Sequence, residues 1–390
     1  MRGRSYGKYV EGDAEALGEM LGRSFAFPPA EARPWLDRVG TGNVRVLRDG
    51  ATPSACLMRI PMGQWFGGRS VRMEGVAGVA VPLERRGQGL GAALMEGLVR
   101  ELGDDGVPLS ALYPATQSLY RKVGYELAGG RFELTVPARS LAIGDRSLPL
   151  RPFSSADRPD VERVYAAWAA SRPGYLDRGE YVWSRVGAPR GEVAYGYVAG
   201  REGELEGYVF LTQRRGPDGR HDLHLTDVAA VTARAARSIL TFLGDQRSVA
   251  MDVVWHGGPA EPLVGLIAEP TFAVRLTHTW MLRVTHVVNA LEARGYPAGV
   301  TGELELEVRD ELCAENDGRF TLRVEGGQGA ACRGGTGGLR LPVRALAPLY
   351  AGHASASALR QVGAIDGSDH AVALADALFA GPSPSMCDLF

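Results

Sequence analysis

Apolar residues occur along the chain in short runs, as in strands, and at helical spacing, as in helices. The two patterns follow one another, which predicts alternating strands and helices. Residues 76–81 form a short apolar run between Gly75 and Pro82, as in a buried strand. Residues 92–102 place apolar side chains at helical spacing up to Gly103, which predicts a helix. The order of elements indicates a mixed α/β domain. The same patterns predict further helices at 11–21 and 35–39, and further strands at 43–48, 55–60, 70–73, 109–114 and 132–136.

The succession of elements restarts after a predicted linker at residues 139–149. A strand at 150–153 and a helix at 160–168 repeat the opening of the chain, and a strand at 206–212 follows. Residues 224–231 then have the same place in the order of elements as the buried run at 76–81 in the first part. The helix that follows them, 232–243, has no glycines at its start. We therefore expect a second domain of the same kind with a degenerate, empty site.

The last part of the chain has a different pattern. Residues 280–283 precede a predicted helix at 287–296, and antiparallel strands are expected where apolar side chains alternate, with turns at 316–318 and 326–327. The tail, 381–390, is expected to be extended because of its prolines. The strands are predicted at 302–308, 319–324 and 339–343, and the later helices at 343–350, 355–362 and 369–379.

Composition and charge narrow the class of protein. A chain of 390 residues is long enough for two or three domains, and its net charge of −2 argues against a general nucleic-acid binder. No apolar run approaches about 18 residues, so no membrane span is expected. The cysteines lack the spacing of a metal site, which favours no metal and free thiols in a reducing cytoplasm. They are Cys56, Cys313, Cys332 and Cys387.

The segment between the buried run and the helix at 92–102 is rich in glycine and arginine. Glycines let a backbone approach an anion closely, and the free N–H groups at a helix start favour negative charge. A nucleotide P-loop would end in Gly-Lys-Ser/Thr, and a dinucleotide fingerprint needs Gly-x-Gly-x-x-Gly; residues 86–91 fit neither. The alternative to an anion site is a glycine-rich turn without a ligand.

Two motifs together resemble the GCN5-related N-acetyltransferases. The first is Arg86-x-x-Gly89-x-Gly91, which is similar to the pyrophosphate loop of that superfamily, and the second is Tyr120-x-x-x-Gly124-Tyr125. The resemblance implies an acetyl-CoA site, with a strand edge that pairs with the pantetheine amides. Its expected residues are Val79, Ala80, Val81, Arg86, Gly87, Gln88, Gly89, Leu90, Gly91, Ala115 and Thr116.

The whole chain resembles the Eis-type (enhanced intracellular survival) acetyltransferases. The residues that carry this resemblance are 86–91, 119–125, 287–296 and the chain end at Phe390. It implies two tandem GCN5-like domains, 1–142 with a live site and 143–278 without one, and a sterol-carrier-protein-like domain at 279–390. It also implies a homo-hexamer, Tyr120 as general acid and the α-carboxylate of Phe390 as general base. The implied acceptors are primary amines, aminoglycosides among them.

The chemistry of the residues is compatible with these roles. A tyrosine with a pKa near ~10 keeps its proton at neutral pH and can donate it, and Tyr120 is expected to begin a helix. Tyr113 and Tyr125 are nearby competitors. A terminal carboxyl with a pKa of about 3.5 is a weak base, and a frayed terminus is the alternative for Phe390. No histidine base is available near the motifs, since the histidines are His221, His224, His256, His278, His286, His353 and His370.

The sequence leaves several alternatives open for the acceptor and for the residues that bind it. Phe25, Phe27 and Trp35 could line a substrate pocket or belong to the core, and Asp388 could attract a cationic amine or be a solvated charge. Protein lysines and polyamines are alternative acceptors. A lipid-binding protein that uses its last domain, or an inactive paralogue, are the other hypotheses. Further acidic candidates are Glu31, Asp37 and Glu126.

Overall fold

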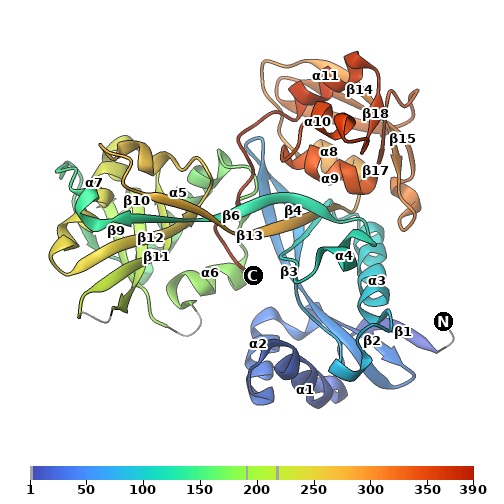
Figure 1. Ribbon diagram of the computed structural model, residues 1–390, viewed down its shortest axis with the longest axis horizontal. Helices are drawn as coiled ribbons and strands as arrows, with labels where there is room; N and C mark the ends of the chain where they lie inside the picture. The colour runs from blue at the N-terminus through green and yellow to red at the C-terminus, as the bar shows by residue number, and fades with distance from the viewer. Residues whose placement is uncertain (1–2, 190–191, 217–218) are drawn as a thin grey trace. The chain divides into compact units, whose positions relative to one another are not determined.

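The computed structural model describes residues 3–189, 192–216 and 219–390 (Figure 1). The chain divides into two compact units. Unit 1 comprises Met1–Gly129, Thr279–Pro382 and Phe390, and unit 2 comprises Gly130–His278 and Ser383–Leu389. In the described residues, the helices are all too short or too polar to cross a membrane.

The first part of unit 1 is a sheet with helices, and its strand order is β1-β2-β3-β4-β5. Neighbouring strands are antiparallel except β4 and β5, which are parallel and are therefore joined by the crossover helix α3. The residues predicted as two strands, 70–73 and 76–81, lie in the single strand β4, except Val81, which follows its last residue. The elements are β1 (Arg4–Lys8), α1 (Ala14–Phe25), α2 (Ala32–Val39), β2 (Val44–Asp49), β3 (Thr52–Phe66), β4 (Arg69–Ala80), α3 (Leu90–Asp104), β5 (Leu109–Leu112) and α4 (Gln117–Arg121).

Helix α3 is held on this sheet by one apolar face. Its residues Leu94, Leu98 and Leu102 are fully buried, at the i, i+4 spacing that places side chains on the same side of a helix. They pack in one cluster with Leu57 of β3 and Val76 of β4. This packing fixes the start of α3 beside the end of β4.

The last part of unit 1 is a second sheet, with strand order β16-β15-β14-β17-β18. Strand β14 buries Leu304, Leu306 and Val308 on one face, as the alternation predicted. Figure 1 shows its helices beside these strands. The elements are α8 (Val287–Ala293), β14 (Gly302–Arg309), β15 (Gly318–Glu325), β16 (Gln328–Arg333), β17 (Leu339–Pro342), α9 (Val343–Ala351), α10 (Ala356–Gln361), β18 (Asp366–Gly367) and α11 (Asp369–Leu378).

A buried ion pair connects the two parts of unit 1. Strand β13 (Ala273–Val284) pairs through Met281–Val284 with β5, and its Arg283 forms an ion pair of 2.6 Å with Asp310 at the end of β14. The guanidinium is fully buried, and the carboxylate also accepts from the backbone N–H of Leu312. Residues near Trp280 thus belong to the first sheet.

We expect Asp310→Ala to lower the free energy of unfolding by about 3–5 kcal/mol, because it leaves the Arg283 charge buried without a partner. Urea denaturation followed by circular dichroism measures this loss. The matched control is Asp366→Ala, which removes an exposed ion pair with Arg340 and should change stability little. Equal losses in the two variants would contradict the prediction.

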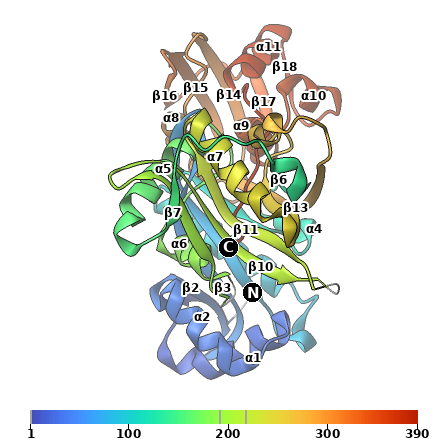
Figure 2. The same cartoon turned by 90° about the vertical axis from the view of Figure 1, so that its left-hand side faces the viewer.

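Unit 2 contains a sheet with strand order β6-β12-β11-β10-β9-β7. Figure 2 shows β10 and β11 side by side; they are antiparallel, whereas β11 and β12 are parallel and are joined through α7. The elements are β6 (Glu126–Pro137), β7 (Leu150–Pro152), α5 (Arg158–Ala170), β8 (Leu176–Asp177), α6 (Glu180–Gly187), β9 (Tyr195–Arg201), β10 (Glu204–Arg215), β11 (His221–Ala230), α7 (Ala233–Gly244), β12 (Ala250–Gly257) and the first half of β13.

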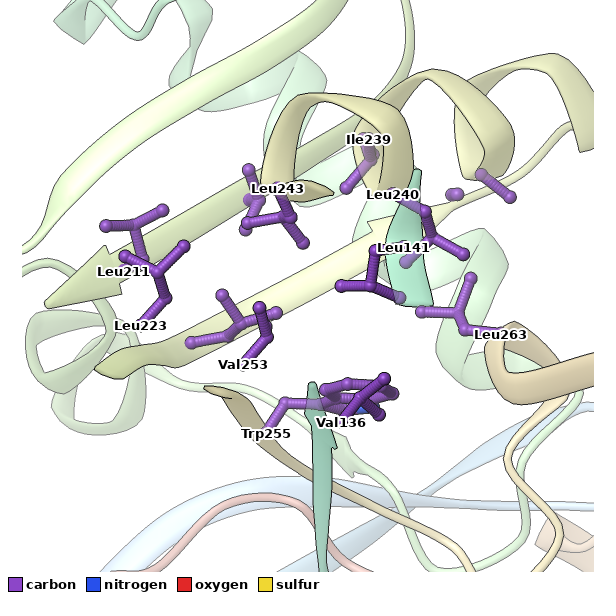
Figure 3. Packing of buried hydrophobic residues seen from close by; sticks show 14 of the residues in the cluster. Val136, Leu141, Leu211, Leu223, Ile239, Leu240, Leu243, Val253, Trp255 and Leu263 are labelled. Carbon is purple, nitrogen blue, oxygen red and sulfur yellow. The ribbon is translucent and has the colours of Figure 1, made fainter. Parts of the chain in front are cut away.

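The core of unit 2 lies between α7 and one face of this sheet. Figure 3 shows Ile239, Leu240 and Leu243 of α7 directed towards Leu223 and Val253 on the strands. Strand β10 contributes alternate residues to the cluster, so the residues between them face the other side of the sheet. Units 1 and 2 thus repeat one plan, a parallel strand pair with a crossover helix.

Candidate active site

The two parallel strands of unit 1 separate part of the way along their length. Pairing between β4 and β5 ends at Gly75 and Ala111, whereas β4 continues to Ala80. The edge of β4 that faces away from β3 is therefore no longer paired with β5 beyond this point. Such an edge can hydrogen-bond an extended ligand that carries amide groups.

A β-bulge changes the direction of strand β4 near its end. Met58 and Cys56 of β3 face Ala77 and Ala80, so one intervening residue of β3 opposes two of β4. Gly78 lies in this bulge with a φ of 60°, which favours glycine. The bulge sets the orientation of Val79, Ala80 and Val81, the residues expected to contact the pantetheine.

The glycine-rich loop forms an open cradle at the start of α3. Gly87 and Gly89 have φ values of 81° and 76°, and Cβ atoms added to either would meet only open space. Gly89 is the N-cap of α3, and no side chain caps the helix. The first N–H groups of α3 are thus available to an anion, and the helix dipole favours negative charge there.

The two arginines of the loop differ in their environment. Arg85 forms an ion pair with Asp49, while Arg86 is exposed and forms no ion pair with a residue that the structure describes. Gln88 is exposed as well, and Leu90 is buried in the helix–sheet core. Arg86 is therefore the cation of this loop that remains available to a ligand.

The second motif lies directly against the first. The Leu119 side chain lies 3.4 Å from the Cβ position of Gly91, and the Val81 side chain 3.9 Å from the same position. Gly124 has a φ of 85°, and Arg283 packs where a side chain at that position would be. The structure therefore brings together the glycine loop, the end of β4 and helix α4.

Tyr120 is buried, with 5% of its surface exposed. Burial raises the pKa of its hydroxyl to about 12, and the hydroxyl forms no hydrogen bond with another described residue. We expected Tyr120 to begin a helix; instead it lies near the end of the short helix α4, which starts at Gln117. Its proton is retained at neutral pH and is not committed to an acceptor in the part of the chain that the structure describes.

The two competing tyrosines have other contacts. The hydroxyl of Tyr125, which is fully buried, donates to Oγ of Ser110 at 2.7 Å, and Ser110 donates to the carbonyl of Glu74. Tyr113 lies half-buried, with its ring centroid 5.7 Å from that of Phe390. Tyr125 is thus committed to the core, and Tyr113 packs against the terminal residue.

Phe390 lies at the point where β4 and β5 separate. Its ring is 2.7 Å from the Cβ position of Gly75, so only a glycine leaves room for the ring there. Gly75 is also the last residue of β4 that pairs with β5. The sequence motifs did not reveal Gly75 and Tyr113 as neighbours of Phe390. For Gly75 the available signal was a glycine inside a strand, a known sign of close approach.

The aromatic residues expected at the acceptor pocket form one cluster. Trp35 makes edge contacts with Phe25 and Phe27, at centroid distances of 5.7 and 6.0 Å. Its ring lies 3.3 Å from the Cβ position of Gly78, beside the bulge of β4. Phe25 is 46% exposed, so this cluster presents aromatic surface next to the end of β4.

The remaining expected residues lie at the margin or elsewhere. Ala115 and Thr116 are exposed just before α4. Asp37 pairs with Arg33, and Glu126 pairs with Arg121 and Arg344. Asp388 belongs to unit 2, where its carboxylate pairs with Arg178. Among the described residues, no group of three or more His, Cys, Asp or Glu side chains could hold a metal ion.

The described residues of unit 2 include no counterpart of the glycine cradle. Only Val231 and Thr232 separate β11 from α7, and the Thr232 hydroxyl accepts from the N–H of Ala235 and so caps the helix. The same hydroxyl donates to Glu206, whose carboxylate would repel a phosphate at this helix start.

Comparisons with known proteins agree with this architecture. Residues 5–128 and 174–284 each match a family model described as an acetyltransferase (GNAT) domain, and residues 287–387 match a sterol carrier protein domain. A GCN5-related N-acetyltransferase from Anabaena variabilis has a similar crystal structure. Its TM-score is 0.94 at 36% identity, over 99% of this chain and 100% of that chain.

Two proteins named Eis are also similar. The N-acetyltransferase Eis of Mycobacterium bovis (strain BCG / Pasteur 1173P2) is 30% identical over 333 residues, 77% of each chain. Eis1 from Mycobacterium abscessus shares the fold, with a TM-score of 0.80 at 20% identity over 99% of this chain and 100% of that chain. Fold and site thus define an N-acetyltransferase of the GCN5-related class, a class that uses acetyl-CoA. The chain belongs to the Eis N-acetyltransferase family. The predicted family and the predicted fold class, two acetyltransferase domains and a sterol-carrier-like domain, are confirmed.

Proposed function

We propose that this enzyme transfers the acetyl group of acetyl-CoA to a primary amine at the site in unit 1. The main observation in support of this proposal is that the glycine cradle contacts the free end of β4 and helix α4, through Gly91, Val81 and Leu119. The cradle and Arg86 hold the pyrophosphate, the edge of β4 near Val79 and Val81 holds the pantetheine, and Ala115 and Thr116, which are exposed just before α4, contact the same cofactor. Acetyl-CoA supplies the activated acetyl group as its thioester.

In this proposal three groups of the chain carry the reaction. A backbone N–H at the edge of β4 stabilises the negative charge that develops on the thioester oxygen as the amine attacks the carbonyl carbon. The α-carboxylate of Phe390 attracts the cationic amine, which first releases one proton to solvent and so becomes the neutral nucleophile. The same carboxylate accepts the second proton, which the nitrogen loses when the C–N bond forms. When the C–S bond breaks, the Tyr120 hydroxyl donates its proton to the departing sulfur, and solvent returns a proton to the tyrosine.

The acceptor that we propose is an aminoglycoside, modified at one or more amines. The aromatic cluster of Phe25, Phe27 and Trp35 offers faces on which a polycationic sugar can lie. Protein lysines and polyamines are the alternative acceptors. With the Eis resemblance as support, we also propose a cytoplasmic homo-hexamer, with an active domain at 1–142, an inactive one at 143–278 and the last domain at 279–390.

Thiol release from acetyl-CoA tests the proposed function. The purified enzyme is mixed with acetyl-CoA and, one at a time, with aminoglycosides, polyamines and lysine peptides. Release with aminoglycosides supports the proposed acceptor. Release only with polyamines or lysine peptides replaces the acceptor and keeps the chemistry, and binding of acetyl-CoA without release with any amine contradicts the proposal.

We expect Arg86→Gln to raise KM for acetyl-CoA by about 10-fold, with little change in kcat. A charge-assisted hydrogen bond to phosphate contributes about 1.5–3 kcal/mol, and exposure of the site lowers that contribution. Steady-state kinetics at low and high salt measures the effect, which should shrink at high salt. The matched control is Arg85→Gln, because Arg85 already pairs with Asp49. Similar KM values in both variants would show that Arg86 does not contact the phosphates.

A further inference from the structure

The segment before Phe390 is fixed to unit 2 by its backbone. The N–H of Gly130 donates to the carbonyl of Pro384 at 3.3 Å, and the N–H of Met386 donates to the carbonyl of Gly130 at 3.1 Å. The N–H of Ser385 donates to Pro173, at 2.9 Å. Ser385 and Met386 are buried, so this segment is not a frayed end.

Asp388, the last charged residue of this segment, forms an ion pair with Arg178 through both of its carboxylate oxygens. One oxygen of Asp388 lies 3.0 Å from Nε of Arg178 and the other lies 2.9 Å from a terminal nitrogen of the same guanidinium. The side chains of Arg178 and Asp388 are 1% and 9% exposed. A planar guanidinium that binds both oxygens of a carboxylate fixes orientation as well as distance.

Arg178 is itself held from three sides. Asp227 of β11 accepts from the guanidinium at 2.5 and 3.0 Å, and Tyr208 of β10 donates to Asp227 at 2.7 Å. The guanidinium carbon lies 3.7 Å from the centroid of the Tyr165 ring. Arg178 is thus positioned by unit 2 whether or not Asp388 is present, since Asp227 compensates its charge.

We propose that Asp388 is a positioning residue, whose ion pair with Arg178 holds the terminal residue Phe390 in place for catalysis. This inference rests on the proposed role of the Phe390 carboxylate. Only Leu389 separates the two residues, and two residues of extended chain span about 7 Å at most. A rigid Asp388 therefore confines the Phe390 carboxylate to a small volume, which lowers the entropy lost when that carboxylate meets the amine.

The ion pair argues against Asp388 as a ligand of the acceptor amine. Both of its oxygens already accept from Arg178, and the Tyr165 hydroxyl lies 3.4 Å from one of them. An amine that bound Asp388 would have to replace contacts with a buried guanidinium. The two roles predict different kinetics, since a positioning residue acts on kcat and a substrate ligand acts on the KM of the amine.

The experiment compares Asp388→Asn with Asp245→Asn, which removes exposed ion pairs with Arg146 and Arg247 in the same unit. Asp388→Asn should fold, because the Arg178–Asp227 pair remains. Two quantities are measured on the full chain: the rate at which carboxypeptidase A releases phenylalanine from the native protein, and the kinetics of acetyl transfer. We expect Asp388→Asn to release phenylalanine about 10-fold faster and to lower kcat about 10- to 100-fold, with the KM of the amine unchanged.

Each outcome has a distinct meaning. Unchanged release overturns the proposal, and so does a higher KM of the amine with unchanged kcat, which would make Asp388 an acceptor ligand. Faster release of phenylalanine with unchanged kcat would show that the Asp388–Arg178 ion pair holds the chain end in place. It would also contradict the catalytic role of Phe390. The release assay needs no activity, so a wild-type enzyme that acetylates no amine would refute the proposed function without affecting this measurement.

Discussion

We expect deletion of Phe390 to lower kcat by about 10²–10⁴-fold, because the deletion removes the proposed general base. The deletion moves the terminal carboxylate back by one residue, away from the position over Gly75 that the Phe390 ring occupies. Binding of acetyl-CoA is expected to change little, because the cradle at Arg86–Gly91 and the end of β4 remain. Thiol-release kinetics together with calorimetric titration of acetyl-CoA measures both quantities.

The matched control for the deletion is Phe390→Leu, which keeps the α-carboxylate and removes only the ring contacts with Tyr113 and Gly75. We expect this variant to lose much less activity than the deletion. If both variants lose the same activity, the ring and not the carboxylate is the essential group. If neither loses activity, Phe390 has no part in the reaction.

Tyr120→Phe is expected to lower kcat by about 10²–10⁴-fold and to leave the KM of acetyl-CoA nearly unchanged. Removal of the hydroxyl leaves the departing sulfur without a proton donor. Because burial raises the pKa of Tyr120 to about 12, the hydroxyl stays almost fully protonated up to about pH 10. The wild-type kcat should therefore show no loss from ionisation of Tyr120 between pH 7 and about 10, which a pH profile measures.

Tyr125→Phe is the control for this prediction. It removes a hydroxyl of the same type in the same motif, but one that donates to Ser110 in the core. We expect a loss of stability of about 1 kcal/mol and no comparable loss of kcat. A kcat for Tyr120→Phe equal to that of Tyr125→Phe would show that Tyr120 is a packing residue.

Local pattern was sufficient to predict most of the fold. The helix α3 and the strand β14 follow from apolar spacing alone, and the order of elements pointed to the repeated plan of the second domain. The strand β4 was divided into two in the prediction because Gly75 resembles a break before the apolar run at 76–81. In the structure Gly75 makes room for a ring and Gly78 forms a bulge, and both are consequences of distant packing.

The parts of the site that sequence did not predict depend on contacts between distant residues. The loop at Arg86–Gly91 and the motif at Tyr120 are contiguous, so a local pattern reveals them. Asp388 and Arg178 are 210 residues apart in the chain, and neither has neighbours that mark it as half of a pair. An isolated aspartate near the chain end was therefore equally compatible with a solvated charge and with an acceptor ligand.

Strand β13 affects how the domains of this protein can be rearranged in evolution. Its residues Met281–Val284 cover the edge of β5, and the N–H of Gly295 donates to the carbonyl of Phe66 at 3.1 Å. A gene fragment that stopped before β13 would encode an acetyltransferase domain with an open strand edge, which favours aggregation. The coding sequence of unit 1 is thus interrupted by that of unit 2, so domain shuffling at the boundaries of the first domain would not transfer a self-sufficient module.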